Sequence, residues 1–351
     1  MARLALVSLL AACLAQAAVI DRKSSTSPSL EVPANSTGGN DIFPLPAGFK
    51  TEPDLNPDKP REGTKTIKLR QGPFTLAPGK GVDDMLQWIT DGGSPCKDCW
   101  ITAVQGGLEF KDGTPATLDK GPMLQHIYVL TGGDRDEVCR SFNLPQPNRL
   151  YITGNERITA RFNTDGQKYG YYSDNEDFFA LRFNAINTGN TSVEVYATQT
   201  YEYIPAAEAK DFKKIITAWL DLGGCGGTWF SPQSGKYDLK SYTWKSSITG
   251  KIIFVAGHVH EGGLNTVLFV NDKPVCTSQQ LYGRKKTSVD PSGKQHISDN
   301  AVCTNIGNIK KGDEIHLTAS YDSTKHPFDA SMKNNGMEAI MAVNNIYVGV
   351  P

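Results

Sequence analysis

The feature that most constrains this chain is a succession of short runs rich in β-branched and aromatic residues. Examples are TKTIKLR, HIYVL, ERITARF, FFALRFNAI and TSVEVYATQTYEYI in the first half, and KIIFVAGHVH, TVLFVND, DEIHLTASY and AIMAVNNIYVGV in the second. Several runs alternate apolar with polar residues, and clusters of Gly, Asn, Asp or Pro separate them. This spacing is typical of antiparallel β-sandwiches. The sequence therefore predicts an all-β protein.

The length of 351 residues fits about two domains. We expect a first β-sandwich domain over residues 64–205 and a second over residues 206–351. The stretch PAAEAKDFKKIITAWLDLGG at the start of the second domain departs from the strand pattern. Its alanines tolerate a helix and its two final glycines would end one, so we expect a helical hinge there. A partly extended conformation is the alternative, because residues 215–217 are β-branched.

The N-terminus has the three parts of a secretory signal peptide. Arg3 supplies a positive charge, Leu4 to Leu14 form an apolar stretch, and Ala15-Gln16-Ala17 fits the cleavage pattern. The stretch is too short to span a bilayer, and no later segment is long and apolar enough. We therefore expect a signal peptide over residues 1–17 and a secreted, extracellular protein without a membrane anchor. Residues 18–63, rich in Ser, Pro, Asn and Gly, are expected to form a low-complexity, poorly ordered leader.

Charge and motifs exclude several function classes. The 36 basic and 37 acidic residues give a net charge of −1, which does not fit a nucleic-acid-binding protein. The sequence has neither the Gly-x-Ser-x-Gly elbow of α/β-hydrolases nor a Walker loop.

The cysteines agree with an oxidising compartment. Of seven cysteines, Cys13 lies in the signal peptide, and the six that remain predict three disulfides. These are Cys96, Cys99, Cys139, Cys225, Cys276 and Cys303. The C-x-x-C pair at residues 96–99 would suggest redox or zinc chemistry in a cytosolic protein, but structural disulfides are the favoured interpretation in a secreted chain. Two sequons, at Asn35 and Asn190, are candidate glycosylation sites.

The segment GHVHEGG, residues 257–263, is the best candidate for a metal site. On a strand, His258 and His260 would point to one face with Cβ atoms about 6.5–7 Å apart, so that both imidazoles could reach one ion. Glu261 would lie on the other face and is a weaker candidate ligand. The alternative is a pair of surface or turn histidines without a ligand.

A third ligand would have to come from elsewhere in the chain. The candidates are the other histidines and two late methionines: His126, His296, His316, His326, Met337 and Met341. A thioether ligand would favour copper, because soft sulfur prefers Cu(I). Packing in a core is the alternative role of each methionine. Trp229 and Trp244 are expected to pack inside the sheets, with glycan binding as the alternative.

Five blocks of sequence occur in an order that points to a known family. They are PCKDCWITAVQGGLEFKDGTPATLDKGPMLQHIYVL, GCGGTWF, GHVHEGGLNTVLFVNDKPVCTSQQLYG, KKGDEIHLTASYD and MAVNNIYVG. Over residues 64–350 the chain resembles the stress-upregulated nodulin family. That family is remotely similar to the copper type II ascorbate-dependent monooxygenases, such as peptidylglycine α-hydroxylating monooxygenase. The resemblance implies two jelly-roll-like β-sandwiches with one copper in each.

The resemblance also implies ligands. In the second domain of these monooxygenases an HxH pair and a late methionine hold copper, and His258, His260 and Met341 match them, with Met337 as the fallback. The first-domain copper uses two adjacent histidines and a third. Here the matching positions read Gln125-His126, and no histidine occurs between His126 and His258. His126 is therefore a further candidate ligand or a packed core histidine, and Gln125 would be a poor substitute ligand.

The hairpin after the HxH block carries an implied disulfide as well. Cys276 and Cys303 flank this long hairpin and are expected to pair. The other four cysteines, at positions 96, 99, 139 and 225, allow three connectivities, which the sequence leaves open.

These features lead to one functional expectation and one alternative. We expect a secreted copper-binding protein of monooxygenase-like fold that hydroxylates a C–H bond of an unknown small molecule or peptide, using O2 and a reductant such as ascorbate. The alternative is a non-catalytic extracellular binding or stress-related module that has lost the first copper site. The incomplete histidine pattern around His126 favours this alternative, because the two-copper scheme stores one electron at each copper.

Overall fold

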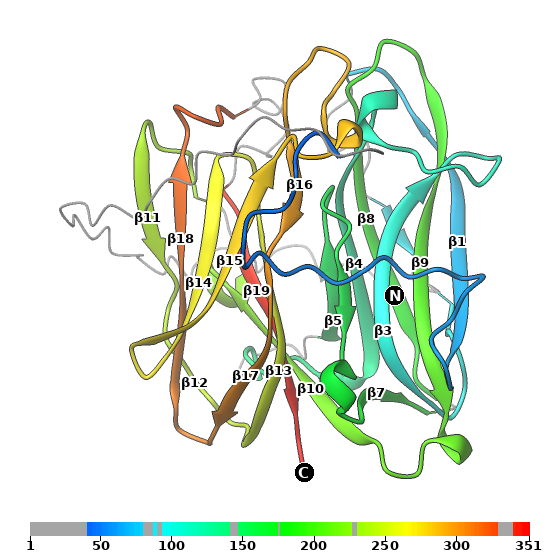
Figure 1. Ribbon diagram of the computed structural model, residues 1–351, viewed down its shortest axis with the longest axis vertical. Coiled ribbons are helices and arrows are strands. Elements are labelled where there is room, and N and C mark those ends of the chain that lie inside the picture. The colour runs from blue at the N-terminus through cyan, green and yellow to red at the C-terminus, as the bar shows by residue number, and fades with distance from the viewer. Residues whose placement is uncertain are drawn as a thin grey trace, which may run out of the picture.

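A computed structural model gives the arrangement of most of the chain (Figure 1). It describes residues 41–79, 87–89, 93–140, 147–174, 176–226, 230–328 and 340–351. Within these ranges the regular secondary-structure elements are β-strands and short 3-10 turns, so the predicted all-β class is confirmed. The jelly-roll connectivity stays a prediction. No helix of the described residues is long and apolar enough to cross a membrane.

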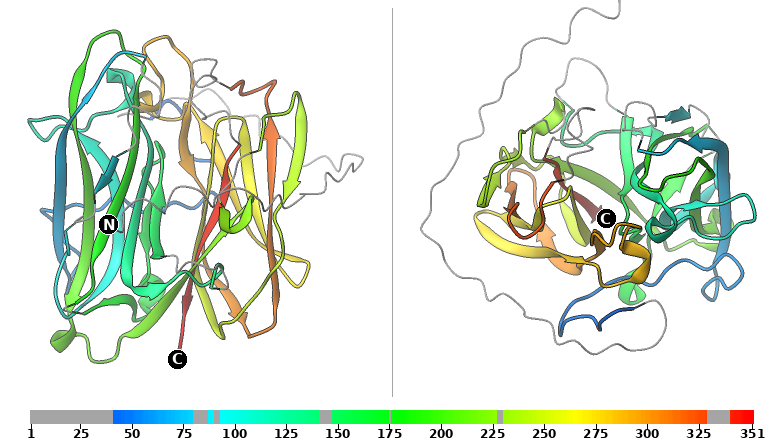
Figure 2. Two further views of the ribbon diagram at one scale, coloured as in Figure 1. Left: turned by 180° about the vertical axis from the view of Figure 1, so that it is seen from behind. Right: turned by 90° about the horizontal axis from the view of Figure 1, so that it is seen from above.

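The largest sheet continues through both halves of the molecule. Its nine strands lie in the order β1 (Lys65–Leu76), β9 (Val193–Pro205), β3 (Cys99–Glu109), β7 (Tyr169–Ser173), β10 (Lys213–Asp221), β19 (Ala342–Gly349), β13 (Gly250–Val259) and β17 (Val302–Ile309), with β6 (Thr159–Arg161) beside β3. The pairs are antiparallel except for a two-residue parallel contact between β7 and β10. Strand β19, drawn in red, lies between the two halves in both views (Figure 1 and Figure 2).

Two smaller sheets complete the two halves. The four-stranded sheet belongs to the first half and has the order β2 (Gln87–Ile89), β8 (Phe179–Asn187), β4 (Pro122–Arg135) and β5 (Pro147–Thr153). The six-stranded sheet belongs to the second half and has the order β11 (Lys236–Lys240), β18 (Glu314–Asp322), β14 (Gly263–Val270), β15 (Lys273–Tyr282) and β16 (Ile297–Asn300), with β12 (Trp244–Lys245) beside β18.

Each small sheet packs against part of the large one across its own hydrophobic core. The first core joins residues such as Val104 and Phe183, and the second joins residues such as Ile346 and Leu317. Trp244 is buried in the second core, in agreement with a packing role, whereas Trp229 lies outside the described residues. The domain boundary at residues 205 and 206 stays a prediction.

The expected helix after residue 205 is wrong. Only Ala206–Glu208 form a 3-10 turn, and the following residues form β10. This strand pairs antiparallel with β19 from Ile215 opposite Gly349 to Asp221 opposite Val343. The β-branched residues 215–217 fit a pleated, buried surface, and pairing in the large sheet outweighs the helix tolerance of the preceding alanines.

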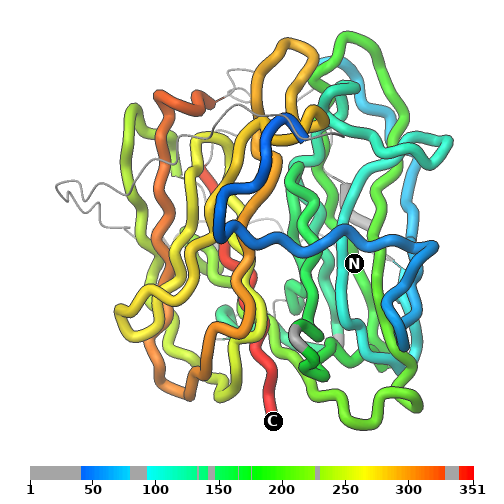
Figure 3. The backbone as a smooth tube through the Cα atoms, viewed as in Figure 1, coloured from blue at the N-terminus to red at the C-terminus, as the bar shows by residue number. Residues whose placement is uncertain are grey.

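Residues 41–58 cross the surface of both halves as an extended segment, here called the N-terminal strap (Figure 3, in blue). The amide of Val302 donates to the carbonyl of Lys50 at 2.9 Å. Further along, the amide of Leu55 donates to Oε1 of Gln105 at 2.8 Å. The strap lies within the predicted leader, so this part of the leader is packed and not poorly ordered. The predicted signal peptide and Asn35 lie outside the described residues.

The structure resolves the open disulfide pairing. It joins Cys96 with Cys99, Cys139 with Cys225, and Cys276 with Cys303, the last being the pair expected from the resemblance. The bond between positions 139 and 225 links a loop of the first half to the second half.

Candidate metal centre

Three imidazoles converge where the two halves meet. His126 lies on β4, His258 lies on β13, and His260 directly follows β13. One ring nitrogen from each lies within 4.8 Å of the others, and no other group of three or more potential His, Cys, Asp or Glu ligands occurs among the described residues. The Nε2 atoms of His126 and His260 are 3.0 Å apart. The structure therefore brings the HxH pair together with the single histidine of the first half.

Strand β13 places the HxH pair because its two faces contribute to different cores. Val255 and Val259 face the second core, whereas Ala256 faces the first. The alternation of a strand then directs His258 and His260 to the side of the first half. Gly257, directly before His258, faces the second core, and a Cβ there would lie 2.0 Å from Oγ1 of Thr266 on β14. Only glycine fits at this close approach.

A β-bulge in β4 places His126. The register between β4 and β8 shifts between Leu124 and His126, so that one extra residue is inserted into β4. Because of the shift, Leu124 faces the first core together with Ile127 and Val129. His126 and Tyr128 consequently face away from that core, toward the second half. Bulges commonly redirect side chains at functional sites in this way.

A buried carboxylate fixes the state of His258. Oε1 of Glu156 lies 2.7 Å from Nδ1 of His258, and both side chains are almost fully buried. An ionised carboxylate only accepts hydrogen bonds, so Nδ1 is the donor in this contact, and in a neutral imidazole Nε2 is then the atom with the lone pair. No described residue is a hydrogen-bond partner of this buried Nε2 atom. An orphaned imidazole nitrogen beside two further imidazoles fits a metal ion with nitrogen ligands.

Burial favours the neutral form of His126. Burial lowers the pKa of His126 well below its ordinary value, and the neighbouring charges of His260 and His258 lower it further. The neutral imidazole favoured in this way is the form that binds metals. Burial alone would raise the pKa of Glu156, but the electrostatic attraction and hydrogen bond to the His258 ring, with backbone amides, outweigh it and lower the pKa.

An apolar and aromatic wall adjoins the histidines and contains Met341. Its sulfur lies 3.9 Å from the hydroxyl of Tyr128, and its carbonyl accepts a hydrogen bond from the amide of His260 at 3.0 Å. The ring of Tyr128 lies 5.2 Å from that of His126 and 5.6 Å from that of Trp219, centroid to centroid. Met341 is thus adjacent to the HxH pair and packs in this wall. Met337 lies outside the described residues.

The other candidate ligands lie in different environments. Nδ1 of His296 contacts Oε1 of Glu261 at 2.8 Å, so Glu261 contacts a different histidine. His316 and His326 each stack on an aromatic ring of the second half.

Glu156 was not among the residues predicted from the sequence. It lies 102 positions before His258, and no sequence motif marks it.

Comparison with known protein families matches a segment that lies mostly in the second half. The family model described as stress up-regulated Nod 19 matches residues 198–333. The predicted resemblance to the stress up-regulated nodulin family is confirmed. The nodulin-family segment includes His258 and His260 but not His126, which belongs to the part of the chain before it.

Two curated relatives cover more of the chain. "Probable copper-dependent oxygenase M1" of Phoma sp. is 26% identical over 297 residues, which are 84% of this chain and 75% of the relative. "Probable copper-dependent oxygenase clz3" of Cochliobolus lunatus is 27% identical over 249 residues, 70% of this chain and 78% of the relative. Among solved structures, PNGF-II matches with a TM-score of 0.37 and 9% identity over 82% of this chain and 65% of that chain, which is too low to indicate a shared function.

Proposed function

We propose that this nodulin-family-like chain is a secreted copper-dependent oxygenase with one metal centre, held by His126, His258 and His260. The convergence of three imidazoles from positions up to 134 residues apart carries the proposal. Two relatives named as copper-dependent oxygenases support copper as the ion. The unpartnered, buried Nε2 of His258 supports a bound metal at this point.

The chain's own residues would bind the metal and shape its surroundings. Copper, when bound, supplies one-electron redox chemistry and the activation of O2. His126 and His258 are both buried, and the lowered pKa of His126 favours the neutral form of this ligand. Trp219 and Met341, both nearly buried, limit water on one side of the centre. A small organic molecule or a peptide that presents a C–H bond beside this wall is the proposed substrate class.

The proposed centre differs from the two-copper scheme of the similar monooxygenases. There, each hydroxylation draws one electron from each copper. In this chain the histidine that would begin the first site joins the HxH pair instead. We therefore propose that an external reductant such as ascorbate delivers both electrons to a single centre, with the thioether of Met341 as an additional candidate ligand that favours Cu(I).

Metal counting combined with oxygen uptake tests this proposal. The secreted protein is loaded with Cu(II), and bound copper is measured for wild type, His126→Ala, His258→Ala and Met341→Ala. His316→Ala, which removes a histidine stacked outside the cluster, is the matched control. We expect one copper per chain in wild type and control, and less than stoichiometric copper in both cluster histidine variants.

Each other outcome has a defined meaning. Wild type without stoichiometric copper would refute the metal centre, and two coppers per chain would refute a single centre. One copper without ascorbate-dependent oxygen consumption would favour the alternative of a non-catalytic extracellular binding module.

Secretion is part of the proposal and has its own test. We propose removal of residues 1–17 and glycosylation at Asn35 and Asn190. The exposed position of Asn190 between β8 and β9 and three disulfides support this. N-terminal sequencing of secreted protein should begin at residue 18, and Asn190→Gln should remove one glycosidase-sensitive mobility shift. Protein retained inside the expressing cell with its first 17 residues intact would contradict secretion.

A further inference from the structure

Glu156 occupies a turn that is built around its carboxylate. The turn follows β5 and is closed by a hydrogen bond from the amide of Arg157 to the carbonyl of Gly154 at 3.1 Å. The amide of Gly154 donates to Oε1 of Glu156 at 3.0 Å, and the same oxygen contacts Nδ1 of His258 at 2.7 Å. Glu156 lies in the first half and His258 in the second, so this hydrogen bond joins the halves at the metal centre.

We propose that Glu156 is the positioning residue of the centre, which holds His258 in the tautomer and orientation that present Nε2 to the metal. This inference rests on the proposed function, because it assigns a role within the same site. Metal-binding histidines commonly donate their second ring N–H to a carboxylate, which fixes the ring and raises the basicity of the ligating nitrogen. The atoms of this chain match that arrangement: the Nδ1 proton goes to Glu156, and Nε2 is free of other partners among the described residues.

Packing around Gly154 holds the pair in place. A Cβ at this position would lie 2.7 Å from Cε1 of His258, 2.8 Å from Oε2 of Glu156 and 2.9 Å from the carbonyl of Gln125. The turn is therefore in contact with the imidazole edge, the carboxylate and the bulged strand β4 together. Glycine is the residue that permits this approach without displacing the ring.

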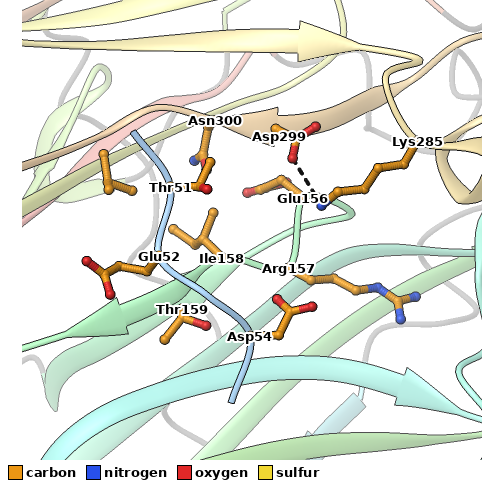
Figure 4. Close-up of a pocket in the computed structure, with 11 residues that line it drawn as sticks. Thr51, Glu52, Asp54, Glu156, Arg157, Ile158, Thr159, Lys285, Asp299 and Asn300 are labelled. Carbon is orange, nitrogen blue, oxygen red and sulfur yellow. Dashed lines mark ion pairs between the residues drawn. The ribbon is translucent and has the colours of Figure 1, made fainter. Parts of the chain in front are cut away.

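A polar cavity lies on the outer side of Glu156. The cavity has a volume of about 50 Å3, and Glu156 lines it together with Arg157 and Lys285 (Figure 4). Thr51 and Asp54 of the N-terminal strap line it from the surface side. The cavity is large enough to hold water, so the outer side of the Glu156 carboxylate adjoins a polar space, while its inner side contacts His258.

Substitutions at position 156 separate positioning from simple stability. In Glu156→Ala the Nδ1 proton loses its acceptor, so the ring can rotate or exchange tautomers. In Glu156→Gln an amide oxygen can still accept the proton but carries no charge. Glu202→Gln is the matched control, because Glu202 is equally buried and contacts Arg161 at 2.6 Å without touching a cluster histidine. Each full-length variant is titrated with Cu(II) sulfate against a competing chelator, and its Cu(II) electron paramagnetic resonance spectrum and thermal unfolding are recorded.

The expected results follow from the loss of ring orientation. Glu156→Ala should bind Cu(II) about 10–100-fold more weakly and with altered copper hyperfine splitting. Glu156→Gln should restore part of the affinity. Glu202→Gln should keep the wild-type affinity and spectrum whatever happens to its unfolding temperature.

Several results would overturn the inference. Wild-type affinity and spectrum in Glu156→Ala would do so, as would equal losses of affinity in Glu156→Gln and Glu202→Gln. If Glu156→Ala does not fold, a Glu156→Gln spectrum identical to that of wild type is the refuting result. Wild type that binds no Cu(II) would refute the metal centre itself, whereas normal wild-type binding with unaffected position-156 variants would refute only the positioning role.

Discussion

Replacing Gly154 with alanine perturbs the metal centre without removing any of its polar groups. The new Cβ would lie 2.7 Å from Cε1 of His258, whereas ordinary contacts begin at 3.4 Å. The imidazole would therefore have to move by about 0.7 Å (3.4 − 2.7), unless the turn moves instead. The carbonyl of Gln125, 2.9 Å away, belongs to a paired strand and blocks an escape in that direction.

Both stability and metal affinity should respond to this change. Overpacking of this kind costs about 1–3 kcal/mol of unfolding free energy. A shift of the imidazole by a comparable distance would also lengthen its 2.7 Å hydrogen bond to Glu156 to as much as about 3.4 Å and so weaken it. We expect Cu(II) affinity to fall about 10–100-fold, as for other losses of a partner that orients a ligand. Denaturant unfolding of the metal-free protein and Cu(II) competition titration measure the two effects separately.

A second glycine provides the control for this experiment. A Cβ at Gly170 would lie 2.9 Å from the carbonyl of Ile101 and 3.2 Å from Cβ of Trp100, which is a similar clash away from the histidines. Gly170→Ala should lose stability but keep its Cu(II) affinity. If Gly154→Ala keeps its Cu(II) affinity within twofold, or if both variants lose affinity equally, the proposed role of the close packing around Gly154 is wrong.

Three further predictions concern pH and covalent structure. Because burial and the neighbouring imidazoles lower the pKa of His126, the ratio of Cu(II) affinity between wild type and His126→Ala should change little from pH 7.5 to 6, and a steep loss of this ratio beginning at pH 6.5 in competition titrations would contradict this. Burial lowers the pKa of His326 to about 4. Between about pH 6.5 and 4 the unfolded chain therefore binds more protons at this residue than the folded chain does. The contribution of His326 to the free energy of unfolding is fully present above pH 6.5 and is lost as the pH falls through 4. His326→Phe should therefore flatten the fall in denaturant midpoint from pH 7 to 4.5, and an unchanged slope would refute this. Replacing Cys139 and Cys225 together with alanine should lower the unfolding free energy by about 2–5 kcal/mol, because their bond closes a long loop with a sequence separation of 86, and an unchanged denaturant midpoint would argue against that contribution.

The strand pattern predicts most of the fold, because its signal is local. Runs such as HIYVL and KIIFVAGHVH alternate over several residues and form β4 and β13. The helix expected after residue 205 fails for a nonlocal reason. Alanines favour a helix only when nothing else competes, and β10 is paired along seven residues with β19, which is distant in sequence. The low complexity of the leader likewise carries no signal that the N-terminal strap packs on both halves.

The HxH pair could be proposed from sequence because both residues lie on one strand, whose geometry fixes their relation. Glu156 could not, because its contact with His258 depends on how the halves meet. A Gly-Asn-Glu turn after a strand is a common pattern and does not indicate a metal-site partner. Comparison with the nodulin family does not point to Glu156 either, because the matched segment begins at residue 198.

The position of His126 has a weak signal in the sequence that becomes clear once the bulge is known. In LQHIYV, strict alternation would put Leu124 on the same face as His126. Leu124 and Ile127, which are both suited to the core, would then lie on different faces of the strand. The structure instead inserts one residue between Leu124 and His126, so both aliphatic residues reach the first core. The burial of two aliphatic side chains, each worth about 1.5–3 kcal/mol, favours the bulge over a regular ladder. His126 alternates with Ile127 and Val129, so their burial in the first core turns the imidazole to the opposite face, toward β13. Core packing of the first half is therefore what delivers the third histidine to the metal centre, and the bulge lets Leu124 join that packing.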